Sequence, residues 1–283
     1  MSSDSSRGVG TRVWVPYLVI AAYLVVGLFP FFVMGITAVK PNAELYSGTT
    51  PPLMVRRLTM EHYRFLFEQT DFLRWFWNST LVAALSTSVS VVISSMAAYA
   101  LARVRFRGST PMGIAIFLTY LVPPTLLFIP LVDVVARLRL ADSIWSLVLT
   151  YPTFLVPFST WMLTGYFKTI PRELEECAMV DGASRFRVLL QIILPLAVPG
   201  LVTATLFSFT LSWGEMIYAV SFISATPLKT LPIGVATSLV RGDVYFWGPL
   251  MAGALLASVP IVLVYSFLTE YFVSGLTAGA TKG

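Results

Sequence analysis

Residues 171–199 read PRELEECAMVDGASRFRVLLQIILPLAVP, a short charged stretch between long apolar runs. Pro171 suits the first turn of a helix, and acids at 173, 175 and 176 are favoured there by the helix dipole. Asp181-Gly182 then predicts a helix end, because glycine permits a sharp turn. Asp181 or Ser184 can cap a second helix that continues into the next apolar run, which Pro195 and Pro199 bend. The stretch therefore predicts a short polar helix beside a membrane span.

The two faces of this short helix suggest a compact projection that a partner protein could contact. Leu174, Cys177 and Ala178 share one face, and Glu173, Glu176 and Val180 share another. Small residues allow close approach of a partner, and an acid is available for pairing. An interfacial amphipathic helix that only connects two spans has the same pattern, so the residues alone leave both readings open.

Charged residues divide the rest of the chain. Six runs carry no charge: 13–39, 75–102, 108–132, 143–167, 188–214 and 244–269. Each is long enough for a membrane helix, which needs roughly 20 apolar residues. Lipid cannot satisfy backbone amides, so the spans must be helical. The sequence predicts an all-α polytopic bundle with six transmembrane helices and both ends on one side.

Composition excludes several functions. Hydrophobic residues make up 57% of the 283 residues and charged residues 12%. This composition is more apolar and less charged than that of a soluble domain. The single Cys177 and the single His62 exclude a disulfide and any two-histidine metal motif, so no metal site is expected. None of the four lysines follows a glycine, so the phosphate loop of an ATPase is absent. The net charge of +5 lies at span ends, which argues against nucleic-acid binding.

Lysine and arginine favour an N-terminus in the cytoplasm. The tally across the two sides is nearly even, but the inside segments are shorter, and three arginines stand together at 103, 105 and 107. The expected division is a cytoplasmic tail at 1–12, a permease domain at 13–275 with a cytoplasmic loop at 168–189, and a cytoplasmic tail at 276–283. The first run is too long for a signal peptide and is expected to be retained.

Several motifs carry a family resemblance. Glu176-Cys177-Ala178, Gly182 and Ile192-x-Leu194-Pro195 resemble the Glu-Ala-Ala loop of permease subunits in ATP-binding-cassette importers, with cysteine in place of one alanine. Further segments resemble the carbohydrate branch, the maltose-permease-like proteins. They are Tyr63-x-x-Leu66-Phe67, Trp75-Phe76-x-Asn78-Ser79, Asp181-Gly182-Ala183, Trp213-Gly214-Glu215, Lys229-Thr230-Leu231-Pro232 and residues 275–280.

The resemblance implies a type I importer permease fold and a coupling role for the loop. The implied contacts with the ATPase are Glu176, Cys177, Ala178, Asp181 and Gly182, with Glu176 paired to a basic group. The implied partners are a second permease, two ATPase subunits that bind ATP and Mg, an extracytoplasmic binding protein and a carbohydrate. This chain would then hold no catalytic residue and no cofactor, and would lie in a bacterial inner membrane. The 277–283 tail either reaches the ATPase dimer or is a free terminus.

The substrate path is sought among polar and aromatic groups in the spans. The main candidates are Asn78, Ser79, Tyr120, Trp213 and Glu215, with Tyr99, Thr125 and Trp161 beside them. Aromatic rings stack on sugars, although most aromatics in spans pack or anchor at the interface. Two alternatives stay open: a stand-alone secondary transporter or channel, which the charge-free runs argue against, and an intramembrane enzyme, for which His62 has no nucleophile near it.

Overall fold

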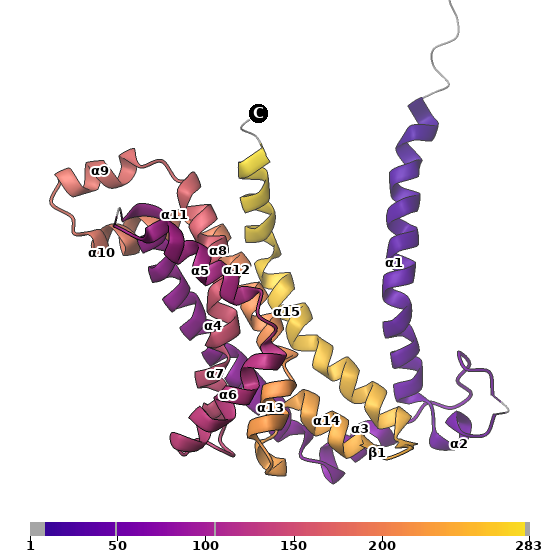
Figure 1. The fold of residues 1–283 in the computed structure, drawn as a ribbon. Helices are drawn as coiled ribbons and strands as arrows, with labels where there is room; N and C mark the ends of the chain where they lie inside the picture. Colours follow the sequence, from indigo (N-terminus) through magenta and orange to yellow (C-terminus); the bar gives the residue numbers. More distant parts are fainter. Residues whose placement is uncertain (1–8, 49, 105, 281–283) are drawn as a thin grey trace, which may run out of the picture. The chain divides into compact units, whose positions relative to one another are not determined.

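The computed structural model describes residues 9–48, 50–104 and 106–280, with the backbone alone for 9–13 and 270–280. Nearly all of it is helical (Figure 1). The helices up to the polar segment are α1 (Val9–Val39), α2 (Asn42–Leu45), α3 (Glu61–Gln69), α4 (Phe72–Arg103), α5 (Ser109–Tyr120), α6 (Pro124–Arg137), α7 (Ile144–Thr150) and α8 (Pro152–Thr169).

The polar segment and the remainder follow. They comprise α9 (Glu173–Val180), α10 (Arg185–Val188), a π-helical turn at Leu189–Ile193, α11 (Leu194–Leu196), α12 (Val198–Trp213), α13 (Ile217–Phe222), a 3₁₀ turn at Thr226–Leu228, α14 (Leu231–Leu239), strands β1 (Val240–Arg241) and β2 (Val244–Tyr245), and α15 (Trp247–Ala280). The all-α prediction is confirmed.

The chain divides into two compact units. The larger contains residues 71–237 and the last part of α15 from Val259, and it is built around α4. Helix α4 packs most extensively against α8 and α12. Its buried surface carries small side chains, among them Ser79, Ala83, Ser86, Ser90 and Ala98. Small residues let helix backbones approach closely, which is how helices associate where lipid removes the hydrophobic driving force.

Prolines bend two spans, and the sequence predicts the second of these bends. The helices α5 and α6 meet at an angle of 96° at Pro123-Pro124. The segment Arg185–Leu196 meets α12 at 81°, between Pro195 and Pro199. Proline removes a helical hydrogen bond and clashes with the preceding turn, so both bends have a local cause.

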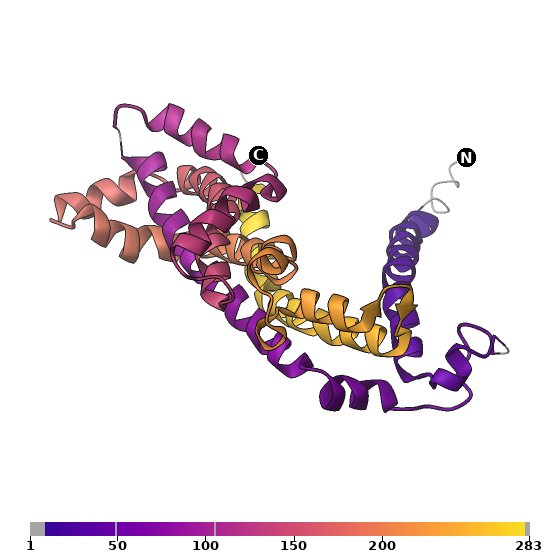
Figure 2. The same ribbon diagram turned by 60° about the horizontal axis from the view of Figure 1, so that its bottom comes forward.

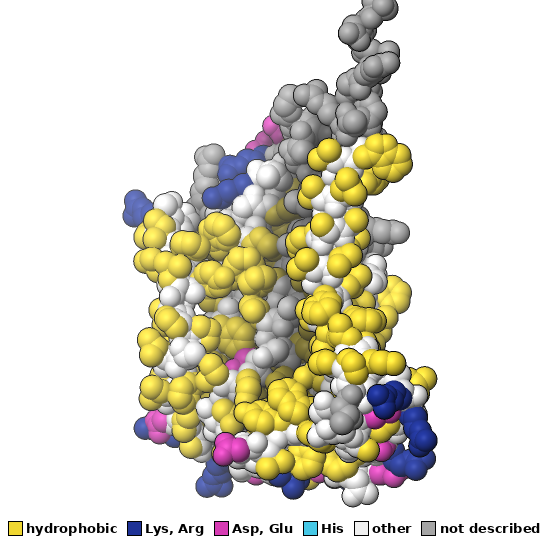
Figure 3. All heavy atoms as spheres, turned by 90° about the vertical axis from the view of Figure 1, so that its right-hand side faces the viewer, with side chains coloured by type: hydrophobic (Ala, Val, Ile, Leu, Met, Phe, Trp, Pro, Cys, Tyr) yellow, Lys and Arg dark blue, Asp and Glu magenta, His cyan; other side chains and the backbone are white. Residues whose placement is uncertain are grey.

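Length and composition of the described helices fit the six expected spans. Four are long and apolar enough to cross a membrane: Trp14–Val39, Phe72–Arg103, Ile144–Thr169 and Trp247–Thr269. The two bent pairs bring the number to six if each pair is one span. Figure 3 shows apolar side chains along the long helices and charged side chains gathered toward their ends. The surface is therefore one that lipid or partner subunits cover.

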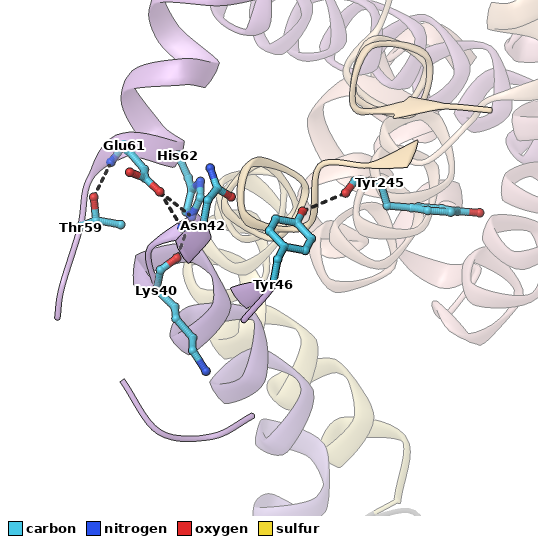
Figure 4. A network of polar contacts seen from close by, with 7 residues as sticks. All are labelled: Lys40, Asn42, Tyr46, Thr59, Glu61, His62 and Tyr245. Atoms are coloured by element: carbon cyan, nitrogen blue, oxygen red, sulfur yellow. Dashed lines mark hydrogen bonds and ion pairs between the residues drawn. The ribbon is translucent and has the colours of Figure 1, made fainter. Parts of the chain in front are cut away.

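The smaller unit contains the described residues before Asp71 together with Ser238–Ser258. Helix α3 contacts the end of α1. Strands β1 and β2 form an antiparallel hairpin, drawn as arrows in Figure 2, that turns at Gly242 with a positive φ of 60°. The Tyr46 hydroxyl donates a hydrogen bond to the Tyr245 carbonyl at 3.0 Å (Figure 4).

Candidate coupling segment and substrate path

The polar segment folds as two short helices joined by a glycine turn. Helix α9 begins at Glu173, so Pro171 lies just before the first turn rather than inside it. At its end, Gly182 N–H bonds to the Met179 carbonyl and Ala183 N–H to the Ala178 carbonyl, with φ +85° at Gly182. These two bonds define the Schellman motif, which requires a left-handed residue. Gly182 therefore ends α9 for a stereochemical reason.

Of the two possible caps, Ser184 caps the next helix. Its hydroxyl accepts a hydrogen bond from Arg187 N–H at 3.3 Å, while Asp181 lies at the C-terminal cap of α9. Figure 1 shows α9 at one end of the larger unit, running across the direction of α4 and α8. Links of only a few residues join α9 to α8 and α10. The side-chain contacts of α9 also help to set its position.

Four of the five implied coupling residues lie on the surface. Glu176, Cys177, Asp181 and Gly182 are exposed, and Ala178 is half-buried against the core below α9. Val180 is 87% exposed although it is apolar. An isolated apolar side chain is ordinary, but here it stands beside exposed acids on a projecting helix. This surface has the form that a protein partner would cover.

The sequence reasoning missed Glu175, the buried acid of α9. Its carboxylate lies 2.6 Å from the Arg103 guanidinium, and both side chains are almost wholly buried. The Tyr99 hydroxyl donates to the same carboxylate at 3.4 Å, and Arg103 also donates to the Ile170 carbonyl at 2.6 Å. The sequence signal for this buried pair is weak. It consists of an arginine in the last turn of a span and the second of three closely spaced acids.

The arginines at positions 103, 105 and 107 are not one surface cluster. Arg103 belongs to α4 and is buried, whereas Arg107 is exposed; Arg105 lies outside the described residues. The group read as an orientation signal therefore contains one residue with an internal role.

Two substrate-path candidates, Asn78 and Ser79, bind the backbone of a later segment of the chain. Asn78 donates to the carbonyls of Pro227 and Lys229 at 2.9 and 3.0 Å. The Ser79 hydroxyl accepts from Leu231 N–H at 2.8 Å, at the start of α14. The Trp75 indole donates to the Thr226 carbonyl at 2.8 Å. The first turns of α4 thus hold the 226–231 segment in place.

Trp213 and Glu215 also make contacts with other residues of this chain. The Trp213 ring is buried, with its centroid 5.6 Å from that of Phe76 in an edge-to-face pair. Glu215 accepts hydrogen bonds from Tyr218 N–H at 2.8 Å, Ala219 N–H at 3.1 Å and the Tyr151 hydroxyl at 2.9 Å. A carboxylate that accepts first-turn amides stabilises a helix start, here that of α13. These contacts account for an acid at the end of a span.

Tyr120 and Trp161 are the aromatic candidates with open surface. Tyr120 lies at the α5–α6 bend, with its ring centroid 5.2 Å from that of Phe158. Trp161, on α8, lines two hollows of about 290 and 510 Å³, the larger between α8 and α12. Among the five main candidates, Asn78 and Ser79 are neighbours on α4 and Trp213 packs against Phe76 of the same helix, while Tyr120 packs against Phe158 of α8; their place on a substrate path stays a prediction.

Known proteins match along nearly the whole chain. Residues 90–278 match the family model described as binding-protein-dependent transport system inner membrane component. The inner membrane ABC transporter permease protein YcjP of Escherichia coli is 36% identical, over 94% of this chain and 95% of that protein. The trehalose/maltose transport system permease protein MalG of Thermococcus litoralis is 34% identical, over 94% and 96%.

The fold has solved counterparts as well. A chain of a bacterial ABC transporter involved in alginate import superposes with a TM-score of 0.81 at 20% identity, covering 96% of this chain and all of that one. The fold is therefore that of an ABC importer permease. With the matched family model and the long, similar relatives, these findings place the chain in the family of binding-protein-dependent transport system inner membrane components, as a multi-pass permease subunit.

Proposed function

We propose that this chain is one of two permease subunits of an ATP-driven importer for a carbohydrate. Permeases named for trehalose and maltose and a transporter named for alginate are among its relatives and structural neighbours. The charge-free spans argue against ion coupling, since ion-coupled carriers usually keep ionisable groups within the membrane. The secondary transporter considered from the sequence is not favoured by these relatives.

The observation that carries the proposal is the exposed surface of α9. Glu176, Cys177 and Asp181 face outward on a short helix at one end of the bundle, next to the exposed Val180. We infer that this surface docks on a separate ATPase subunit, with Glu176 paired to a basic group there. ATP and Mg would bind only to the ATPase subunits, and this chain would hold no catalytic residue.

The proposed assembly also includes a second permease and an extracytoplasmic binding protein. In this arrangement α9 and both termini lie on the cytoplasmic side, as the distribution of arginine and lysine favours. The substrate-path residues remain predictions; of these, Tyr120 and Trp161 have the accessible rings that stacking on a sugar requires.

Reconstitution tests the function. The chain, its partner permease, the ATPase and the binding protein are placed in lipid vesicles, and uptake of labelled sugars is measured with and without ATP. We expect uptake only with ATP and with all subunits present, and no effect of an uncoupler. Uptake by this chain alone without nucleotide would overturn the proposal.

The docking surface has its own test within the same system. Glu176→Lys should abolish uptake, because the lysine would repel the basic group on the ATPase with which Glu176 pairs. The matched control is Glu68→Lys, which reverses an exposed acid on α3. Normal uptake and normal copurification of the ATPase with the Glu176 variant would contradict the assigned surface.

A further inference from the structure

We propose that Arg103 and Glu175 form the joint through which movement of α9 reaches α4, the central helix of the larger unit. The proposal rests on the coupling function assigned to α9 above. It adds a specific route: force on α9 passes to α4 through a buried ion pair, in addition to passing along the chain into α8 and α12.

The guanidinium of Arg103 holds two points of the α8–α9 junction at once. It lies 2.6 Å from a Glu175 carboxylate oxygen on α9 and donates to the Ile170 carbonyl, in the link between the helices, at 2.6 Å. The Ile170 contact is a hydrogen bond, which fixes the direction of the guanidinium, whereas Arg103 Nε and Glu175 Oε1 meet as an ion pair without hydrogen-bond geometry. The helix and its preceding link are therefore both fastened to the last turn of α4.

A second arginine makes the reverse connection. Arg172, at the N-terminal cap of α9, donates to the Ala102 carbonyl of α4 at 3.5 Å. Thus α4 supplies a donor to the α9 side and α9 supplies a donor to the α4 side. Tyr99, one helical turn before Arg103, adds a hydroxyl bond to Glu175. Four side chains therefore take part in the joint, Tyr99 and Arg103 from α4 and Arg172 and Glu175 from the α9 side.

The burial of Arg103 and Glu175 makes their separation costly. Removing one partner of a buried ion pair leaves an uncompensated charge, which is strongly unfavourable, whereas an apolar pair of similar volume is often tolerated. A buried pair is thus weak evidence for added stability, but it strongly penalises separation of the two elements. Because α4 packs against both α8 and α12, a joint at its end transmits movement into the middle of the bundle.

Charge reversal tests the joint in the reconstituted importer. Arg103→Glu and Glu175→Arg are made singly and together, and both sugar uptake and ATP hydrolysis are measured. Each single variant should lose about tenfold or more of the sugar transported per ATP hydrolysed, while the double variant should recover most of it, because only the double variant restores an opposite-charge pair. Arg107→Glu, which reverses an exposed charge four residues away, is the matched control and should leave the ratio unchanged.

The transported-to-hydrolysed ratio separates a joint from a merely structural contact. A fold-stabilising contact would lower uptake and hydrolysis together, through loss of assembled complex, and leave the ratio intact. Copurification of the ATPase and second permease normalises both rates. If the single variants assemble and keep the wild-type ratio, or if the assembled double variant stays as defective as the singles, the joint is refuted.

A second variant covers the case in which reversed charges prevent folding. Arg103→Met with Glu175→Leu replaces the pair by apolar side chains of similar size. It should fold and assemble yet show a reduced ratio, since packing is kept while the ion pair and the hydrogen bond to Ile170 are lost; a wild-type ratio would overturn the proposal. Failure of the function itself is distinct, because the wild-type complex would then show no ATP-dependent sugar uptake at all.

Discussion

Gly182 shows how one backbone conformation sets the shape of the coupling segment. Its φ of +85° belongs to a region that side chains with a Cβ avoid. Nothing lies within 4 Å of the position that a Cβ would take. The cost of a substitution here to the stability of the fold therefore comes from backbone conformation and not from a steric clash.

Substitution at Gly182 should follow left-handed propensity. Gly182→Ala should destabilise the turn by about 1 kcal/mol, whereas Gly182→Asn should cost less, because asparagine tolerates the left-handed region. Gly182→Asp, which adds a charge to the proposed docking surface, should abolish uptake. Thermal unfolding in detergent and copurification of the ATPase measure the two effects. Equal loss of uptake in Gly182→Asn and Gly182→Asp would show that the added charge does not decide docking.

Single residues were predictable where the cause is local. The glycine turn and the Ser184 cap follow from neighbours in the chain, and both are seen. The burial of Glu175 was not predictable, because it depends on the end of α4 lying opposite, some 70 residues earlier in the sequence. The backbone contacts of Asn78 and Ser79 were not predictable for the same reason, and the place of these two residues on a substrate path stays a prediction.

The first turns of α4 form a platform for the segment that leads into α14. Gly234 of α14 lies directly against the Trp75 indole, and a Cβ there would overlap the ring. The Trp75 and Asn78 side chains bond to carbonyls of the same segment. The close approach of helix and ring thus requires glycine at this position.

Gly234→Ala should therefore destabilise the protein by about 1–3 kcal/mol, the usual cost of overpacking. Gly165→Ala is the matched control, since nothing lies within 4 Å of its Cβ position on α8, and alanine in a helix is neutral or favourable there. Thermal unfolding of the two variants in the same detergent compares them. Equal melting temperatures would mean that the ring moves aside without cost.

Asp142 ties the α6–α7 connection to the segment after α13. Its carboxylate accepts from Ser224 N–H at 2.9 Å and Ala225 N–H at 2.8 Å, and these two donors hold the pKa of Asp142 below its ordinary value. The folded state therefore binds this proton less readily than the unfolded state. The resulting stabilisation is complete above the unfolded pKa of about 3.9 and is lost as the pH falls through the lower folded value.

Asp142→Asn should remove this acid dependence while keeping the positive φ of 58° that the position adopts. The difference in melting temperature between wild type and Asp142→Asn should accordingly shrink as the pH is lowered from 6 toward about 3. Asp142→Ala should be less stable than either at pH 6, because it loses the acceptor and strains the backbone. A difference independent of pH would contradict the role of the charge.

Elements were predictable in proportion to their length. The six charge-free runs predicted the apolar spans because a bilayer fixes how long such a helix must be, and Pro195 and Pro199 predicted the bend before α12. Helix α14 and the β1–β2 hairpin were missed. Residues 215–243 are moderately apolar, with prolines and glycines spaced through them, so no periodicity separates a short helix from a loop.

Contacts across long sequence distances complete the fold, and His62 shows this in the smaller unit. Its Nε2 lies 2.8 Å from the Lys40 carbonyl at the end of α1, so this nitrogen carries the proton (Figure 4). The ring also fills the space beside Gly248 at the start of α15, where a Cβ would overlap it. One buried side chain therefore joins three segments that are far apart in the chain, which explains a lone histidine without any catalytic role.

The His62–Gly248 contact predicts a compensating pair of substitutions. Gly248→Ala should destabilise the protein by about 1–3 kcal/mol through overpacking, and His62→Ala should destabilise it by removing a buried ring and its hydrogen bond. In the double variant the new methyl group enters the space that the ring vacated, so the combined loss should be smaller than the sum of the two. Melting temperatures of the four proteins in one detergent give the coupling. Strict additivity would mean that α3 and the start of α15 do not share this contact, and that the fold of this unit is closed by other residues.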